Sequence, residues 1–284
     1  MSFENIGVVG SGIMGSGVAE VAASTGASVT VRARTISGAD AVLVAVDRSL
    51  AKQVEKGKLD VEDAAELRRR ITVTTELADL AACDFVIETV VENLAVKMET
   101  FRALDAVVGP KAILATCTST LPIIDLAMQV SHPERVCGVH FFNPVNAMAL
   151  VEVVRPLMAS DETMDKVNEF VLACRKDPIE VKDQAGFIVN ALLFPYLNNA
   201  VRLFEQGVAT MEGIDAAMKG GCGFPMGPFA LLDLVGLDTS LAILDALYHE
   251  YGDANYKPVP LLRRMVSAGR LGRKSGAGFY QYDR

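Results

Sequence analysis

The chain has 284 residues, enough for one large domain or two ordinary ones. Hydrophobic residues make up 51% and charged residues 22%, which predicts a packed core and excludes general disorder. The net charge of −8 argues against a general nucleic-acid binder, because such proteins need a basic face. Neither a leader-like start nor an apolar run of about 20 residues is present, so we expect a cytoplasmic protein without a membrane partner.

The chain opens on a strand, a glycine-rich turn and a helix start. An apolar run at 6–9 leads into Gly10-Ser11-Gly12-Ile13-Met14-Gly15, and a helical stretch follows. Here Gly10 permits a tight turn, Gly12 lets the backbone approach a pyrophosphate, and Gly15 lets the helix pack closely on the strand. The N–H groups at the helix start, around Ile13 and Met14, then face the phosphates. An ordinary glycine-rich turn is the alternative, but the second strand at 27–32 favours dinucleotide binding.

The end of that second strand bears on the choice of cofactor. A carboxylate there would bind the adenosine ribose and select NAD. This chain has Arg32, Ala33, Arg34 and Thr35 instead. Arginine suits a 2′-phosphate, so the sequence favours NADP over NAD, although both arginines could be solvated surface charges.

Short β-rich runs alternate with helical patterns through the first two thirds of the chain. We expect strands at 5–9, 28–32, 71–74, 85–88, 112–116, 136–139, 150–154 and 179–181, and helices at 40–55, 61–69, 96–108 and 162–174. This alternation predicts an α/β fold, a Rossmann-type doubly wound and mostly parallel sheet. The helical stretches at 40–58 and 61–70 together are long for one crossover and predict a hairpin projecting from the sheet.

The pattern changes after residue 184, where helical segments continue without a convincing strand. We therefore expect a dinucleotide-binding domain at 1–184 and an all-helical domain for substrate binding and dimerisation at 185–284. The five cysteines are scattered without CxxC spacing, which predicts buried free thiols and no metal site.

His140 ends an apolar strand beside the expected nucleotide crevice, where α/β proteins bind ligands. Its imidazole suits a general base near neutral pH, although a satisfied core histidine is an equally simple interpretation. Glu152 is a single carboxylate in the next apolar run. A turn at 143–146 could bring Glu152 beside His140 to orient the ring; the alternative is an edge-strand carboxylate facing water.

Two polar residues are further candidates near this crevice. Ser119 follows the strand at 113–116 and could bind a substrate oxygen, or it could cap the helix that follows. Asn190 lies in an apolar stretch, so its amide makes either a helix-packing hydrogen bond or a substrate contact.

Several motifs, in order along nearly the whole chain, resemble the L-3-hydroxyacyl-CoA dehydrogenase family, which includes the 3-hydroxybutyryl-CoA dehydrogenases. The motifs are Gly10 to Gly15, Val90-Val91-Glu92-Asn93-Leu94, Thr118-Ser119, His140-Phe141-Phe142-Asn143-Pro144-Val145, Leu150-Val151-Glu152-Val153, Gly186-Phe187-Ile188-Val189-Asn190, Phe224-Pro225-Met226-Gly227-Pro228-Phe229, Asp233 to Thr239 and Gly272-Arg273-Lys274-Ser275-Gly276. The resemblance implies interconversion of 3-hydroxyacyl and 3-ketoacyl thioesters by hydride transfer.

The resemblance also implies roles for individual residues. His140 is the base and Glu152 its partner, and Ser119 and Asn190 hold the substrate oxygen. Glu92 and Lys97 contact the cofactor, and Ser49 and Lys56 on the hairpin contact the CoA moiety, with Asn143 also on the substrate side. Glu92 could instead cap the helix starting near Asn93, and the hairpin lysines could be a plain solvated face. The family is usually homodimeric through its helical domain.

The chain departs from the family pattern at three places. Ala33 replaces the usual Asp, and Cys117 replaces an Asn on the nicotinamide side, with Thr120 replacing a Ser. Residues 146–149 read Asn-Ala-Met-Ala where the family has Pro-Val-Met-Lys. The changes near the substrate pocket allow an altered acyl group or an acyl-carrier-protein substrate in a biosynthetic pathway. A non-catalytic nucleotide-binding relative is the alternative from another class.

Overall fold

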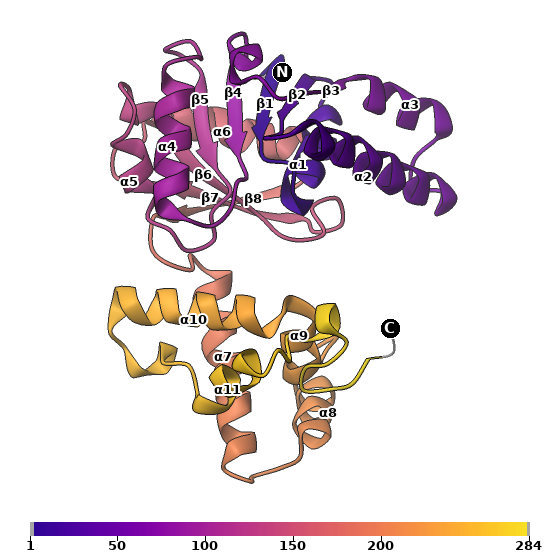
Figure 1. The fold of residues 1–284 in the computed structure, drawn as a ribbon, viewed down its shortest axis with the longest axis vertical. Coiled ribbons are helices and arrows are strands. Elements are labelled where there is room, and N and C mark those ends of the chain that lie inside the picture. The colour runs from indigo at the N-terminus through magenta and orange to yellow at the C-terminus, as the bar shows by residue number, and fades with distance from the viewer. Residues whose placement is uncertain (1–2, 283–284) are drawn as a thin grey trace. The chain divides into compact units, whose positions relative to one another are not determined.

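The computed structural model describes residues 3–282 and divides into two compact units, one ending at Asp183 and the other beginning at Gln184 (Figure 1). The strands are β1 (Asn5–Val9), β2 (Ser28–Arg32), β3 (Ile71–Thr74), β4 (Phe85–Glu88), β5 (Ile113–Thr116), β6 (Val136–Phe141), β7 (Leu150–Arg155) and β8 (Asp177–Lys182). The first unit's helices are α1 (Ile13–Ala23), α2 (Ile36–Glu55), α3 (Val61–Arg69), α4 (Leu94–Asp105), α5 (Ile123–Ala127) and α6 (Asp161–Ala173). All eight strands therefore belong to the first unit.

These strands form one sheet in the order β3-β2-β1-β4-β5-β6-β7-β8. All neighbours are parallel except β6 and β7, which run antiparallel. The order reverses between β1 and β4, which is where doubly wound folds bind ligands at the carboxyl ends of the strands. The predicted α/β class and mostly parallel sheet are confirmed.

Helices cover both faces of the sheet. Side chains of α1, α2 and α6 share one apolar core with alternate residues of the strands. Gly138 points to the opposite face, where an added Cβ would meet Ile123 of α5. The pair α2 and α3 forms the expected helical hairpin, which projects at the β3 side of the sheet (Figure 1). One side of α2 packs into the core, through Val42, Val46 and Leu50, while the rest of the hairpin extends away from the sheet.

The second unit is helical in its described part. It contains α7 (Val189–Glu205), α8 (Met211–Cys222), α9 (Pro228–Val235), α10 (Leu237–Tyr251) and α11 (Pro260–Ser267). Asp233 of α9 is buried and accepts hydrogen bonds from the backbone N–H groups of Phe279 and Tyr280, both at 2.8 Å. This carboxylate fastens the segment after α11 onto the helices.

Candidate active site

The three glycines of the first turn differ in what surrounds them. Gly10 has φ +130°, and an added Cβ would lie 2.7 Å from the carbonyl oxygen of Thr89, just after β4. A Cβ on Gly15 would overlap the carbonyl oxygen of Gly10. Around Gly12 there is no atom within 4 Å of an added Cβ. The fold itself therefore requires two of the glycines, while Gly12 leaves open space at the turn.

The start of α1 borders the same turn. Gly12 is its N-cap residue, so no side chain accepts from the helix's first N–H groups, and the first turn holds no acidic residue. An uncapped helix N-terminus is a favourable site for an anion. The open space at Gly12 and the uncapped helix together fit the pyrophosphate of a dinucleotide.

The two arginines at the end of β2 have different surroundings. Arg32 is half-buried, and its Nε donates to the carbonyl oxygen of Thr75 at 3.2 Å. Ala33 is fully buried, whereas Arg34 is exposed. Thr35 is the N-cap of α2, its Oγ1 accepting from the N–H of Gly38 at 3.1 Å. Arg34 is therefore the arginine that can turn toward a ligand at this strand end.

His140 and Glu152 face each other across the antiparallel pair β6 and β7, whose register places them directly opposite. The His140 Nδ1 and the Glu152 Oε2 lie 2.6 Å apart. The Glu152 side chain is fully buried, and that of His140 is 9% exposed. A carboxylate accepts but does not donate, so it holds the ring with Nδ1 protonated. The alternative of an edge-strand carboxylate facing water is wrong.

Ser119 and Thr118 converge on Glu92. The Glu92 Oε1 accepts from the Thr118 hydroxyl at 2.6 Å, the Ser119 N–H at 3.0 Å and the Ser119 hydroxyl at 3.3 Å. Glu92 itself is exposed, while Thr118 is buried. The loop after β5 is thus fixed to the loop after β4 at the edge where the strands end.

The capping alternatives for Ser119 and Glu92 are wrong. The helix after Ser119 begins only at Ile123, and its first N–H groups donate to the Asp183 carboxylate. At α4 the capping residue is Asn93, whose side chain accepts from the N–H of Val96 at 3.1 Å.

Lys97 is fully buried and pairs with a residue that the sequence reasoning missed. Its Nζ lies 2.8 and 3.0 Å from the two carboxylate oxygens of Glu88 and 3.5 Å from the Glu92 Oε2. Thr116 donates its hydroxyl to Glu88 at 2.7 Å. The available signal was a carboxylate ending the apolar strand β4, nine residues before a lysine.

Cys117 follows β5, and its N–H donates to the carbonyl oxygen of Glu88 at 2.8 Å. Burial raises the pKa of its thiol to about 11, so the thiol is neutral at physiological pH.

All five cysteines are free thiols: three are buried, Cys117 is half-buried and Cys222 is exposed. The prediction of buried thiols is thus wrong for Cys222, which lies at the end of α8.

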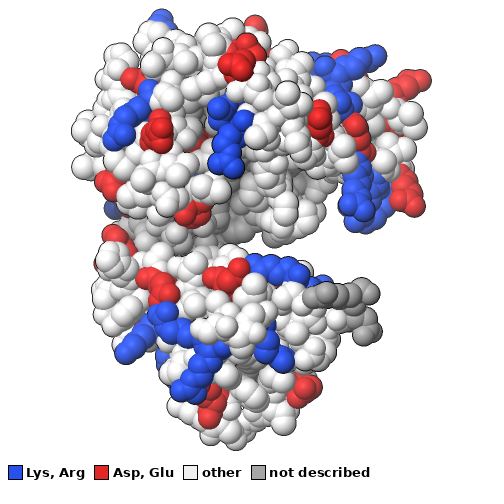
Figure 2. All heavy atoms as spheres, in the orientation of Figure 1, with Lys and Arg blue, Asp and Glu red and all other residues white. Residues whose placement is uncertain are grey.

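The candidate substrate residues of the first unit lie on the hairpin and on the loop after β6. Ser49 is half-buried on α2, and Lys56, just past the end of α2, is exposed, as is Asn143. Lys and Arg side chains on the hairpin are interspersed with Asp and Glu (Figure 2). Asn190 belongs to the second unit, where it is buried in the first turn of α7.

Among the described helices, none combines the length and apolarity needed to cross a bilayer. Residues 3–282 also contain no group of three or more His, Cys, Asp or Glu side chains that could hold a metal ion.

Comparisons with known proteins find matches along nearly the whole chain. Residues 5–184 match the 3-hydroxyacyl-CoA dehydrogenase NAD binding domain, and residues 186–282 match the 3-hydroxyacyl-CoA dehydrogenase C-terminal domain. The chain belongs to the 3-hydroxyacyl-CoA dehydrogenase family. The resemblance seen in the motifs is confirmed, and membership makes the chain a dehydrogenase with a nicotinamide cofactor. The non-catalytic alternative is set aside.

Individual relatives align with nearly all residues of this dehydrogenase. A 3-hydroxybutyryl-CoA dehydrogenase of Clostridioides difficile is 44% identical over 98% of this chain and 99% of its own. The crystal structure of FadB2 of M. tuberculosis superposes with a TM-score of 0.97 at 45% identity, covering 99% of both chains. That of the (S)-3-hydroxybutyryl-CoA dehydrogenase PaaH1 of Ralstonia eutropha has a TM-score of 0.96 at 41% identity, covering 99% of this chain and 100% of that one.

Proposed function

We propose that this dehydrogenase interconverts short-chain 3-hydroxyacyl-CoA and 3-ketoacyl-CoA, with His140 as acid–base group and Glu152 as its partner. The observation that carries the proposal is the 2.6 Å contact between the His140 Nδ1 and a fully buried carboxylate at the ligand-binding edge of the sheet. The relatives named 3-hydroxybutyryl-CoA dehydrogenase support 3-hydroxybutyryl-CoA and acetoacetyl-CoA as the substrate pair.

The proposed roles follow from the hydrogen bonding of the ring. With Nδ1–H held by Glu152, the Nε2 of His140 takes the proton of the substrate 3-hydroxyl, and Glu152 stabilises the resulting imidazolium. A bound nicotinamide would supply the acceptor for the hydride that leaves the substrate C3. Ser119, held through Glu92, positions the substrate oxygen. In the reduction of a 3-ketoacyl thioester, His140 returns the proton to the developing alkoxide.

The acid–base proposal is tested by His140→Gln and Glu152→Gln. Each should lower kcat for reduction of acetoacetyl-CoA by about 10²- to 10⁴-fold, because a positioned acid–base group is lost. Nucleotide affinity, followed by the fluorescence of the reduced cofactor, should hardly change. His132→Gln is the matched control, because His132 is exposed and pairs with the exposed Glu134 at 3.1 Å. Near wild-type turnover in both site variants would remove His140 and Glu152 from the mechanism.

For the cofactor, we propose that NADPH is used at least as well as NADH. Ala33 supplies no acceptor for the ribose hydroxyls and no charge to repel a 2′-phosphate, and the exposed Arg34 next to it can pair with that phosphate. The missing acceptor weakens NAD binding by about 1–3 kcal/mol. Arg32 contributes less, because its guanidinium is engaged by Thr75.

Cofactor choice is tested by comparing kcat/KM for NADPH and NADH in three variants. Arg34→Ala should lower kcat/KM for NADPH selectively, and Ala33→Asp should shift preference toward NADH. Arg32→Ala is the control and should leave the ratio of the two values close to that of the wild type. A wild-type enzyme that strongly favours NADH would contradict this part of the proposal.

We also propose that the first unit binds the cofactor and that the second unit contributes Asn190 to substrate binding and forms a homodimer. Large apolar side chains are exposed on α7 and around it, among them Leu192 at 71%, Leu203 at 43% and Val208 at 65%. We propose that these side chains form one apolar patch, a feature that is typical of protein interfaces. The partner is a second copy of this chain, as in the family pattern.

A further inference from the structure

We propose that Asn146 is a specificity-determining residue, which positions the hydroxyl of Ser49 as a hydrogen-bond donor toward the carrier half of the substrate. The proposal rests on the proposed function, in which that carrier is coenzyme A. Asn146 lies in the loop between β6 and β7, the loop that connects His140 to Glu152. It is one of the positions at which the chain departs from the family pattern, where a proline is usual.

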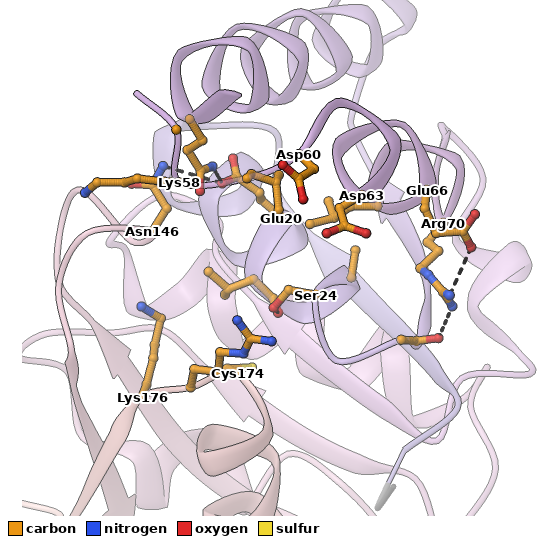
Figure 3. Close-up of a pocket in the computed structure, with 18 residues that line it drawn as sticks. Glu20, Ser24, Lys58, Asp60, Asp63, Glu66, Arg70, Asn146, Cys174 and Lys176 are labelled. Atoms are coloured by element: carbon orange, nitrogen blue, oxygen red, sulfur yellow. Dashed lines mark hydrogen bonds and ion pairs between the residues drawn. The ribbon is translucent and has the colours of Figure 1, made fainter. Parts of the chain in front are cut away.

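The amide of Asn146 is oriented by a buried carboxylate. Its Nδ2 lies 2.9 Å from the Ser49 Oγ on α2 and 3.4 Å from the Glu20 Oε1 on α1. Glu20 is 5% exposed and also accepts from the Gln53 Nε2 at 2.7 Å. Figure 3 shows Glu20 and Asn146 near each other at the cavity wall. Because a carboxylate only accepts, it selects the nitrogen side of the Asn146 amide, and the same nitrogen then meets Ser49.

This contact determines what Ser49 can offer to a ligand. The Ser49 Oγ accepts a hydrogen bond from the Asn146 Nδ2, so the hydroxyl hydrogen of Ser49 points in another direction. Among the described residues, no side chain accepts a hydrogen bond from this hydroxyl. Ser49 lies on α2 and Lys56 is the residue that caps its end, seven residues or about two helical turns later, so both are on one side of the helix. A donor hydroxyl and an ammonium on one side of a helix match the phosphate oxygens of a nucleotide-bearing carrier.

The loop that carries Asn146 is itself held in place. Lys176, 6% exposed just before β8, donates from its Nζ to the carbonyl oxygens of Val145 at 2.5 Å and Met148 at 2.7 Å. These carbonyls stand on both sides of Asn146. Lys176 and Asn146 also line a cavity of about 600 Å³ beside α1 and the hairpin (Figure 3). Because this backbone is fixed, the side-chain amide of Asn146 can set the position of the Ser49 hydroxyl. A proline at position 146 could not do so, since its side chain has no hydrogen-bond donor.

The experiment compares two substrates that share the reacting part, acetoacetyl-CoA and acetoacetyl-pantetheine, which lacks the nucleotide of the carrier. Asn146→Ala and Asn146→Pro should raise KM for acetoacetyl-CoA roughly 3- to 10-fold, the value of one hydrogen bond. The kcat, and the KM for acetoacetyl-pantetheine, should change by less than about 2-fold on the same grounds. Asn168→Ala is the matched control, an amide removed from α6, where Asn168 has no side-chain hydrogen bond among the described residues.

A double-mutant cycle separates positioning from a general structural role. Asn146→Ala added to Ser49→Ala should raise KM for acetoacetyl-CoA no further than Ser49→Ala alone, because both changes remove one interaction. An equal KM rise for both substrates, or additive effects in the double variant, would overturn the proposal. If the wild type does not reduce acetoacetyl-CoA at all, the proposed function fails. If it does and Asn146→Ala leaves KM unchanged, only the inference about Asn146 fails.

Discussion

Three carboxylates in the first unit are buried, and the partner of each decides what it can do. Glu20 accepts from side-chain amides, Glu88 is paired with the ammonium of Lys97, and Glu152 contacts the imidazole of His140. A buried carboxylate needs such partners, since removing it from water costs several kcal/mol. Only imidazole exchanges its proton readily near neutral pH, so the proposed acid–base role falls to the His140 and Glu152 pair, while Glu20 and Glu88 have partners of other kinds.

The Lys97 and Glu88 pair yields a prediction about stability. Lys97→Met should lower the free energy of unfolding by about 3–5 kcal/mol, because it leaves the fully buried Glu88 carboxylate without its counter-charge. Urea unfolding of the enzyme without cofactor measures this directly. Combining Lys97→Met with Glu88→Gln should restore part of the loss. A change below about 1 kcal/mol in the single variant would show that the pair contributes little, and Lys97 would then be free for the cofactor contact that the family resemblance implies.

At the scale of elements, the three glycines of the turn between β1 and α1 have two different roles. Gly10 and Gly15 are required by the fold, whereas Gly12 leaves space for a ligand. Gly12→Ala should leave the urea midpoint nearly unchanged, since an added Cβ meets no atom within 4 Å. It should nevertheless weaken cofactor binding, because the methyl group occupies the space that the pyrophosphate needs. Gly15→Ala should cost about 1–3 kcal/mol, because its Cβ overlaps the Gly10 carbonyl. Equal stability losses in both variants would contradict this division.

Several strands and helices lie at the residues where the sequence predicts them, and others differ at their ends. The first four strands and α3 lie at the predicted residues, because each is a short apolar or amphipathic run bounded by turn residues. The sixth strand extends past residue 139 to Phe141, since its antiparallel neighbour β7 supplies hydrogen-bond partners there. The eighth strand is also longer than predicted, 177–182 rather than 179–181; it is a largely exposed edge strand, so its ends carry no apolar signal.

In the site, sequence reasoning found His140 and Glu152 because each is a polar residue within apolar surroundings. It missed Glu88 and Thr116 and gave no role to Thr118, because the importance of these residues comes from contacts between neighbouring strands and loops rather than from any local pattern. It also missed the tie between Asn146 and Ser49, which are 97 residues apart in the chain. Long-range side-chain pairs of this kind are specified only by the folded topology.

At the scale of the whole molecule, the exposed apolar side chains of the second unit predict self-association. Sedimentation velocity at micromolar concentration should give a dimer, because burying such side chains stabilises association. Leu192→Asp should shift the equilibrium toward monomer, since a charge at an apolar interface is costly to desolvate. Val44→Asp, an exposed apolar position on α2 of the first unit, is the control and should remain dimeric. A clean wild-type monomer would contradict the dimer proposal.

The antiparallel register of β6 and β7 gives the loop between them an unusual evolutionary freedom. Because the ladder itself sets His140 opposite Glu152, exposed loop residues such as Asn146 can change identity without disturbing that pair, whereas Phe142 packs against the His140 ring. Their number is less free: inserting or deleting one residue that shifts the register by one would turn Glu152 to the other face of the sheet. Substitutions at exposed positions of this loop can therefore accumulate while the contact between His140 and Glu152 is retained. Descendants of this enzyme should diversify here by replacement rather than by change of length.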